Sequence, residues 1–185
     1  GGEFSCILFN QTKYKVLLQG TFWLSQTPHK VSMGWDAACN RVCSYGLFEN
    51  KITKKRLWVF NTHFDHVGET ARLESARLIM ERIKQLTAKQ NYPVVLTADL
   101  NAQPNEAPVQ YISRLLHNAR SISLMPPYGP EATWNGFQFH EIPKGWIDYV
   151  FVSGGIKVQK YAVITDSYDC KHPSDHFPVL VHLTY

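Results

Sequence analysis

Several features are missing from this sequence of 185 residues, and each absence removes a class of protein from consideration. No apolar run approaches the roughly 20 residues that a membrane-spanning helix needs. No run of Lys or Arg forms a basic tail, and a net charge of +4 is compatible with an anionic substrate without identifying one. Internal repeats and low-complexity segments are also absent.

Cysteine is scarce, and the spacing of the four cysteines matches no zinc motif. Cys39 and Cys43 either form a disulfide or remain as buried thiols. Buried thiols are the favoured interpretation, because cysteine is among the most frequently buried residue types.

The composition that remains is globular. Hydrophobic residues make up 44% of the chain and charged residues 18%, and the length allows one domain with a substantial core. Aromatic residues, at 13%, favour a strand-rich fold.

Hydrophobic patterns predict more strands than helices. The predicted strands cover residues 4–9, 15–18, 20–25, 41–49, 55–62, 94–96, 146–152, 157–164 and 178–183. Apolar residues at helical spacing predict an amphipathic helix over residues 69–90, and a shorter helix is expected over residues 106–116. Loops are expected over residues 26–40 and 125–143. This order predicts sheets with helices on their outer faces.

The stretch from Thr97 to Asn101 places polar side chains at the end of a buried strand. Side chains two residues apart on a strand point the same way, so Asp99 and Asn101 are expected to face one spot. A carboxylate and an amide aimed together suit a metal-bound water or a phosphate oxygen. The alternative is an Asx turn that closes the strand.

Three other predicted strand ends carry the same kind of residue. His63 follows one strand, Asp148 lies in a second, and the pair Asp175-His176 precedes a third. Each polar group buried without a partner costs about 1–3 kcal/mol. Four such places in one chain therefore indicate that these residues partner one another.

These residue types together suit the cleavage of a phosphate ester. Asp175 offers hard oxygen ligands for a divalent cation, and His176 is a candidate general base whose ring Asp148 would orient. Asn101 and His63 would donate to the charge that develops on the phosphate. Each residue also has a structural explanation, as a satisfied histidine, a cap or an ordinary loop residue.

Four motifs resemble, in order and spacing, those of the endonuclease/exonuclease/phosphatase superfamily, which includes DNase I-like nucleases, neutral sphingomyelinases and inositol polyphosphate 5-phosphatases. They are Asn61-Thr62-His63, Ala98-Asp99-Leu100-Asn101, Ile147-Asp148-Tyr149-Val150 and Ser174-Asp175-His176-Phe177-Pro178-Val179. Residues 20–25, with Gly34-Trp35-Asp36 and Arg41, are most similar to a bacterial branch of that superfamily.

The resemblance implies a four-layer α/β/β/α sandwich, in which two mostly antiparallel sheets carry outer helices. It implies a phosphodiesterase, nuclease or phosphatase that depends on Mg²⁺ or Mn²⁺. The expected substrate is a phosphoester of a nucleic acid, lipid or sugar, and a small or single-stranded one is preferred because the 125–143 loop contains no Lys or Arg. Exposed aromatic residues would wall its pocket if they are not part of the core.

The resemblance also implies a role for each residue at a matching position. Asp99 would position or activate the attacking water and help hold the metal, together with Asp175. His63 and Asn101 would contact the phosphate, and Asp148 would orient His176. The remaining candidate, Arg41, would support substrate binding from the neighbouring strand.

Members of this superfamily carry an earlier segment with a metal-binding Glu, and we expect residues 1–185 to form one domain that lacks this segment. Glu3 is not expected to replace that Glu. Weak metal binding and low activity are therefore expected of these residues. Two alternatives to a phosphoesterase stay open: an inactive module that binds a phosphorylated ligand, and a structural sandwich without a site. The compartment and the oligomeric state stay open.

Overall fold

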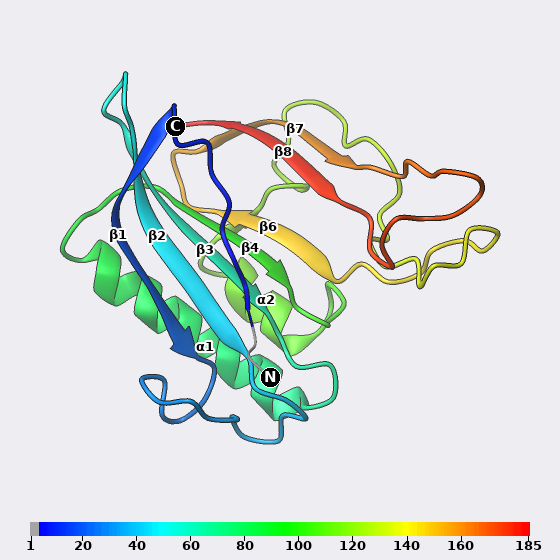
Figure 1. Ribbon diagram of the computed structural model, residues 1–185, viewed down its shortest axis with the longest axis horizontal. Helices are drawn as coiled ribbons and strands as arrows, with labels where there is room; N and C mark the ends of the chain where they lie inside the picture. The colour runs from blue at the N-terminus through cyan, green and yellow to red at the C-terminus, as the bar shows by residue number, and fades with distance from the viewer. Residues whose placement is uncertain (1–3) are drawn as a thin grey trace.

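A six-stranded sheet forms the centre of the computed structural model, which describes residues 4–185 (Figure 1). Its strand order is β1-β2-β3-β4-β6-β5. The strands are β1 (Tyr14–Trp23), β2 (Val42–Asn50), β3 (Arg56–His63), β4 (Val94–Asp99), β5 (His117–Asn118) and β6 (Asp148–Val152). All neighbouring strands are antiparallel except β3 and β4. A parallel pair needs a crossover connection, and helix α1 (Glu69–Thr87) supplies it.

Helix α1 covers one face of the sheet. Its buried stripe includes Ala76, Ile79 and Ile83, as the helical spacing in the sequence predicts. The residue before its first turn is Gly68, which has no side chain to cap the helix, and Asp36 from the 26–40 loop accepts the Ala71 N–H at 2.7 Å instead. Helix α2 (Ala107–Ser113) packs beside α1 on the same face.

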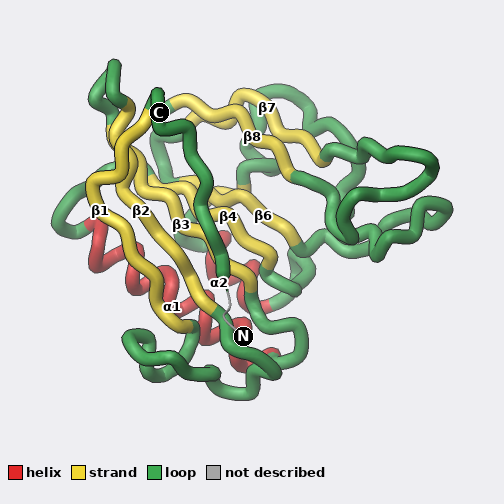
Figure 2. The backbone as a smooth tube through the Cα atoms, in the orientation of Figure 1, coloured by secondary structure: helices red, strands yellow, loops and turns green. Residues whose placement is uncertain are grey.

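A second sheet covers the other face and consists of β7 (Lys157–Val163) and β8 (Val179–Thr184). Figure 2 shows both helices on one side of the large sheet and β7 and β8 on the other. Within residues 4–185 the layers are therefore helices, large sheet and small sheet. The predicted class, two mostly antiparallel sheets with helices outside, is confirmed. Neither α1 nor α2 has the length and hydropathy to span a membrane.

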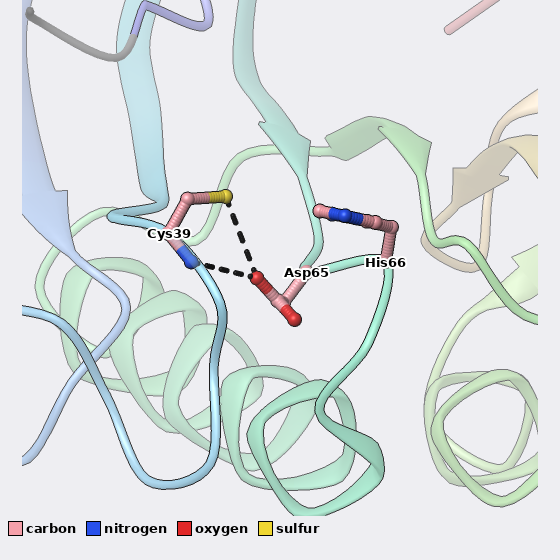
Figure 3. A group of neighbouring side chains, drawn as sticks. All are labelled: Cys39, Asp65 and His66. Atoms are coloured by element: carbon pink, nitrogen blue, oxygen red, sulfur yellow. Dashed lines mark hydrogen bonds between the residues drawn. The ribbon is translucent and has the colours of Figure 1, made fainter.

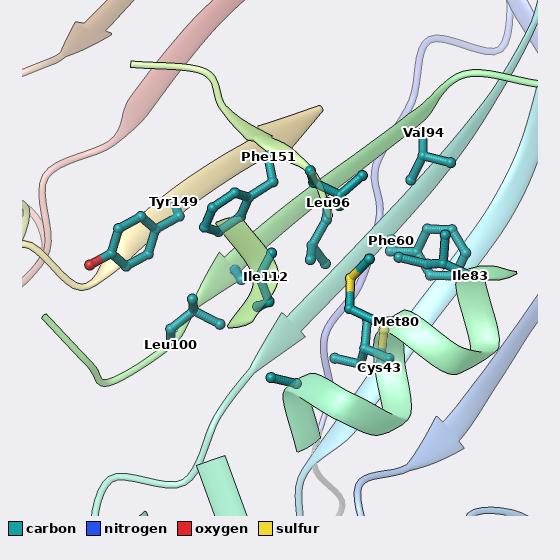
Figure 4. Close-up of a cluster of buried hydrophobic side chains, with 14 of the residues drawn as sticks. Cys43, Phe60, Met80, Ile83, Val94, Leu96, Leu100, Ile112, Tyr149 and Phe151 are labelled. Carbon is teal, nitrogen blue, oxygen red and sulfur yellow. The ribbon is translucent and has the colours of Figure 1, made fainter. Parts of the chain in front are cut away.

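Side chains that alternate along the central strands fill two cores. Leu96 of β4 and Phe60 of β3 face the helices with Phe151, as Figure 4 shows, whereas Val95 faces the small sheet with Val152. Both faces of the central strands are thus buried, which explains why residues 94–96 read as a continuous apolar run.

Two strand predictions differ from the structure, and the preference for a buried thiol over a disulfide is confirmed at Cys43. The sequence predicts a strand over residues 4–9, but within the described residues 4–185 they pair with no strand, and the Asn61 amide donates to their backbone at Cys6 O. Residues 15–18 and 20–23 lie in one strand, β1, in which Gly20 accommodates the ring of its cross-strand partner Tyr45, whereas residues 24 and 25 lie beyond its end. No disulfide joins Cys39 and Cys43, and Cys43 is a fully buried thiol as predicted.

Candidate active site

Three of the predicted residues lie in a row at one edge of the large sheet. His63 ends β3, Asp99 ends β4 and Asp148 begins β6. In the register of the sheet His63 pairs with Asp99, and Asp99 pairs with Asp148. The parallel β3–β4 pair and the antiparallel β4–β6 pair therefore bring these three side chains to the same edge.

His176 reaches the row from the segment before β8. Its Nδ1 lies 2.8 Å from Asp148 Oδ2, and its Nε2 lies 3.9 Å from Asp99 Oδ2. A carboxylate accepts hydrogen bonds, so Nδ1 carries the proton and a neutral ring keeps its lone pair on Nε2. The hydrogen bond to Asp148 and the charges of Asp148, Asp99 and Asp175 raise the pKa of His176, and burial only partly opposes them.

Asp99 is held in an unfavourable electrostatic environment. Burial and the negative charge of Asp148 raise its pKa, although His63, the Asn101 N–H and His176 act in the opposite direction. The imidazole of His63 lies 3.2 Å from the carboxylate, measured from Nε2 to Oδ2. Ligand atoms of Asp99, Asp148 and His176 all lie within 4.8 Å of one another, which makes this trio a candidate cation site.

Asn101 is tied to the same row. Its backbone adopts a left-handed conformation with φ of 45°, which Asn tolerates, and its N–H donates to Asp99 Oδ1 at 2.9 Å. The Asx turn that the sequence left as an alternative is therefore present. The side chain still reaches the site, because Nδ2 donates to Phe64 O and lies 3.1 Å from His63 Nε2.

A cleft of about 400 Å³ opens over this edge. His63, Asp99, Asp148 and His176 all line it, together with Ser174 and residues of β3, β4 and β6. A larger cleft of about 570 Å³ lies at the opposite end of β4, but its lining is mainly apolar or neutral, with Lys84 as its one ionisable group besides Tyr92. Of these two clefts, the smaller one therefore holds those predicted site residues.

The remaining predicted residues lie at the periphery. Asp175 is adjacent to His176, but its carboxylate is not part of the trio, and its carbonyl oxygen accepts the N–H groups of Asn135 and Gly136. Arg41 is buried just before β2, close to the end of β3. Glu3 lies outside the described residues.

Sequence reasoning missed Thr133, which is buried and accepts hydrogen bonds from the Ile147 and Asp148 N–H groups at 3.1 Å. Thr133 lies in the predicted 125–143 loop, whose sequence pattern assigns it no role. The one signal available was a small polar residue between Ala132 and Trp134, in a segment otherwise rich in Pro, Gly and aromatic residues.

A second group of ligand-type side chains, Cys39, Asp65 and His66, is a structural junction rather than a metal centre (Figure 3). The buried Asp65 carboxylate already accepts four backbone N–H groups, from Val67, Gly68, Ala38 and Cys39, and the Cys39 thiol also donates to it. Burial alone would raise the pKa of Asp65, but these N–H donors hold it far below its usual range. With its oxygens engaged, Asp65 has little capacity left for a cation.

Two packed sheets with outer helices, and a His–Asp pair beside a second Asp at the strand ends, define a DNase I-like α+β protein. The chain belongs to the endonuclease/exonuclease/phosphatase family, whose sequence profile matches residues 12–176. The resemblance found in the sequence is thereby confirmed.

Solved structures of bacterial members are similar over nearly the whole chain. A mannosyl-6-phosphatase from Bacteroides thetaiotaomicron VPI-5482 is 36% identical with a TM-score of 0.92, and the match covers 96% of this chain and 69% of that one. A family member from Bacteroides vulgatus is 33% identical with a TM-score of 0.87, over 95% and 68% of the two chains. The human Nocturnin catalytic domain shares the fold, at 18% identity and a TM-score of 0.71, over 95% and 62%. A comparison with curated proteins gave no significant match.

Proposed function

We propose that this chain carries the catalytic centre of a phosphoesterase that depends on a divalent cation and hydrolyses a phosphate monoester of a small, sugar-like molecule. The observation that carries the proposal is the trio of Asp99, Asp148 and His176, whose ligand atoms lie within 4.8 Å of one another in an open cleft. The 36% identity to a mannosyl-6-phosphatase supports the choice of a sugar phosphate.

The residues present fit a divalent cation. Asp99 and Asp148 bring two carboxylates together, and burial and the charge of Asp148 raise the pKa of Asp99, which is the environment that a bound cation would relieve. Carboxylate oxygens are the ligands that Mg²⁺ prefers, and Mn²⁺ also accepts the nitrogen of an imidazole. Asp99 and Asp148 would hold the ion, with Asp175 as a further candidate ligand. When bound, the ion supplies positive charge against the phosphate oxygens.

His176 is the proposed general base. Asp148 fixes the ring through Nδ1, so that Nε2 is the nitrogen available to accept a proton from the attacking water. Asp99 lies 3.9 Å from that nitrogen, which suits a carboxylate that orients the same water.

His63 and Asn101 are the proposed phosphate contacts. His63 Nε2 and Asn101 Nδ2 lie 3.1 Å apart, close enough to approach one phosphate oxygen together. His63 is 40% exposed at its side chain and can reach a substrate in the cleft. Arg41, which directly precedes β2, would support substrate binding at the end of the site where His63 lies.

The proposal is tested with four substrates in Mg²⁺ or Mn²⁺ and in EDTA: mannose 6-phosphate, p-nitrophenyl phosphate, bis-p-nitrophenyl phosphate and a single-stranded DNA oligonucleotide. We expect cation-dependent release of phosphate from the two monoesters, with mannose 6-phosphate the better substrate. Faster hydrolysis of the diester or the oligonucleotide would contradict the monoesterase assignment.

A second candidate is a module of the same fold that binds a phosphorylated ligand without hydrolysing it. The match covers 69% of the phosphatase chain, so the phosphatase has residues with no counterpart here. If those residues are required for turnover, the present chain would bind a phosphorylated ligand without hydrolysing it. Saturable binding of inorganic phosphate, without hydrolysis of any of the four substrates, would select this candidate.

A further inference from the structure

We propose that Thr133 is a positioning residue that fixes the geometry of the Asp148–His176 pair. The proposal rests on the function proposed above for its link to catalysis. The structural part rests on the hydrogen bonds that Thr133 makes in two directions.

The first direction leads to Asp148. Thr133 is completely buried, and its Oγ1 accepts the N–H groups of Ile147 and Asp148, each at 3.1 Å. Asp148 is the first residue of β6, so these bonds hold the start of that strand. The Thr133 hydroxyl also contacts Gly145 O at 3.4 Å, and its hydrogen therefore has an acceptor.

The second direction leads to His176. The carbonyl oxygen of Thr133 accepts the N–H of Phe177, the residue after His176, at 2.7 Å. The next residue, Trp134, lies opposite His176 in an antiparallel bridge. Thr133 thus lies between the segment that carries Asp148 and the segment that carries His176, and it bonds to both.

Neighbouring bonds reinforce the segment before His176. The Asn135 side chain is buried and donates to Ser174 O at 3.1 Å, while its backbone N–H donates to Asp175 O at 2.8 Å. The position of His176 is therefore set from the 133–135 segment rather than by β8 alone. Thr133 is the member of this segment that also contacts Asp148.

The hydroxyl is required because two N–H groups share one acceptor. Valine has nearly the same shape, but it cannot accept a hydrogen bond, so Thr133→Val leaves both N–H groups without their partner. The start of β6 must then shift or admit water, and the 2.8 Å contact between Asp148 and His176 changes with it. Shifts of about 1 Å at a reacting group can cost about 100-fold in rate.

The experiment compares Thr133→Val with Thr133→Ser, which keeps the hydroxyl. Thr87→Val is the matched control, because the Thr87 hydroxyl also bonds to a backbone carbonyl, at Ile83 O, but lies on α1 away from the site. The first readout is kcat and KM on p-nitrophenyl phosphate with Mn²⁺. The second is the downfield proton resonance of His176 Nδ1–H without substrate, assigned by its loss in His176→Ala.

We expect Thr133→Val to lower kcat by at least about tenfold with little change in KM, and to weaken or shift the His176 resonance. Thr133→Ser should stay within about threefold of the native kcat and keep the resonance. If Thr133→Val does not fold, Thr133→Ala, which adds no bulk, serves in the same comparison.

An unchanged His176 resonance in a folded variant without the hydroxyl would overturn the proposal. So would an equal loss of kcat in Thr133→Ser and Thr133→Val. If the native chain hydrolyses no substrate, the proposed function fails, but the resonance still decides whether Thr133 positions the pair.

Discussion

His176 Nδ1 lies 2.8 Å from Asp148 Oδ2, and this contact joins the start of β6 in the large sheet to the segment before β8 of the small sheet. It fixes the tautomer of His176 and raises the pKa of its ring. A protonated His176 is therefore stabilised in the folded state. This contribution to stability is fully present below the unfolded pKa of about 6.5 and is lost as the pH rises through the higher folded pKa.

Asp148→Asn is expected to lower the pKa of His176. The variant removes the negative charge and the charge-assisted hydrogen bond, whereas burial, which disfavours the charged ring, remains. An NMR titration of the His176 ring, without added cation, measures the change. An unchanged pKa for His176 would contradict this account of its environment.

Asp99→Asn is expected to preserve or increase the stability of the cation-free protein at pH 7. The folded state raises the pKa of Asp99, so its ionised form destabilises the fold, and an amide removes that charge. The advantage of the variant should shrink as the pH falls through the raised pKa, because protonation removes the same charge. Thermal unfolding in EDTA at several pH values measures this.

The same variant is expected to lose the response to a divalent cation. Mn²⁺ at about 100 times its dissociation constant stabilises a protein with one site by about 2.7 kcal/mol. We expect this rise in the native chain and in Glu131→Gln, an exposed control, but not in Asp99→Asn. Equal stabilisation of all three proteins would place the cation elsewhere.

Asp65→Asn is expected to destabilise the fold by about 3 kcal/mol at pH 7, because an amide cannot accept all four backbone N–H groups that the carboxylate accepts. The folded pKa of Asp65 is depressed, so its contribution is present above the unfolded pKa of about 3.9 and is lost as the pH falls through the folded value. Urea unfolding at pH 7 measures the change, with the exposed Asp166→Asn as the control. A difference below about 1 kcal/mol between the two variants would show that the junction in Figure 3 is dispensable.

Much of the site was predictable because strand geometry is local. The apolar runs around His63, Asp99 and Asp148 identify their strands, whereas Asn101 reaches the same spot through the Asx turn after β4 rather than by strand alternation. The cost of burying single polar groups then predicts that they meet, as they do. The roles of Asp99 and Asp148 are predictions that the two variants above test.

The rest depended on contacts that no local pattern encodes. Residues 4–9 form a largely apolar run that resembles a strand, but a strand needs a backbone partner, and none pairs with them in residues 4–185. The role of Thr133 depends on its loop meeting both the start of β6 and the segment before β8. Asp65 gave no periodic signal, because its partners come from two loops.

The central claim is that Asp99, Asp148 and His176 form a cation-dependent hydrolytic centre, and the rate of phosphate release by His176→Ala tests it most directly. Native chain and variant are compared on mannose 6-phosphate in Mg²⁺, Mn²⁺ and EDTA, with matching unfolding temperatures as the control for folding. We expect a cation-dependent native rate that falls by about 10²–10⁴-fold in the variant. A variant as fast as the native chain, or a native rate unaffected by EDTA, would contradict the claim.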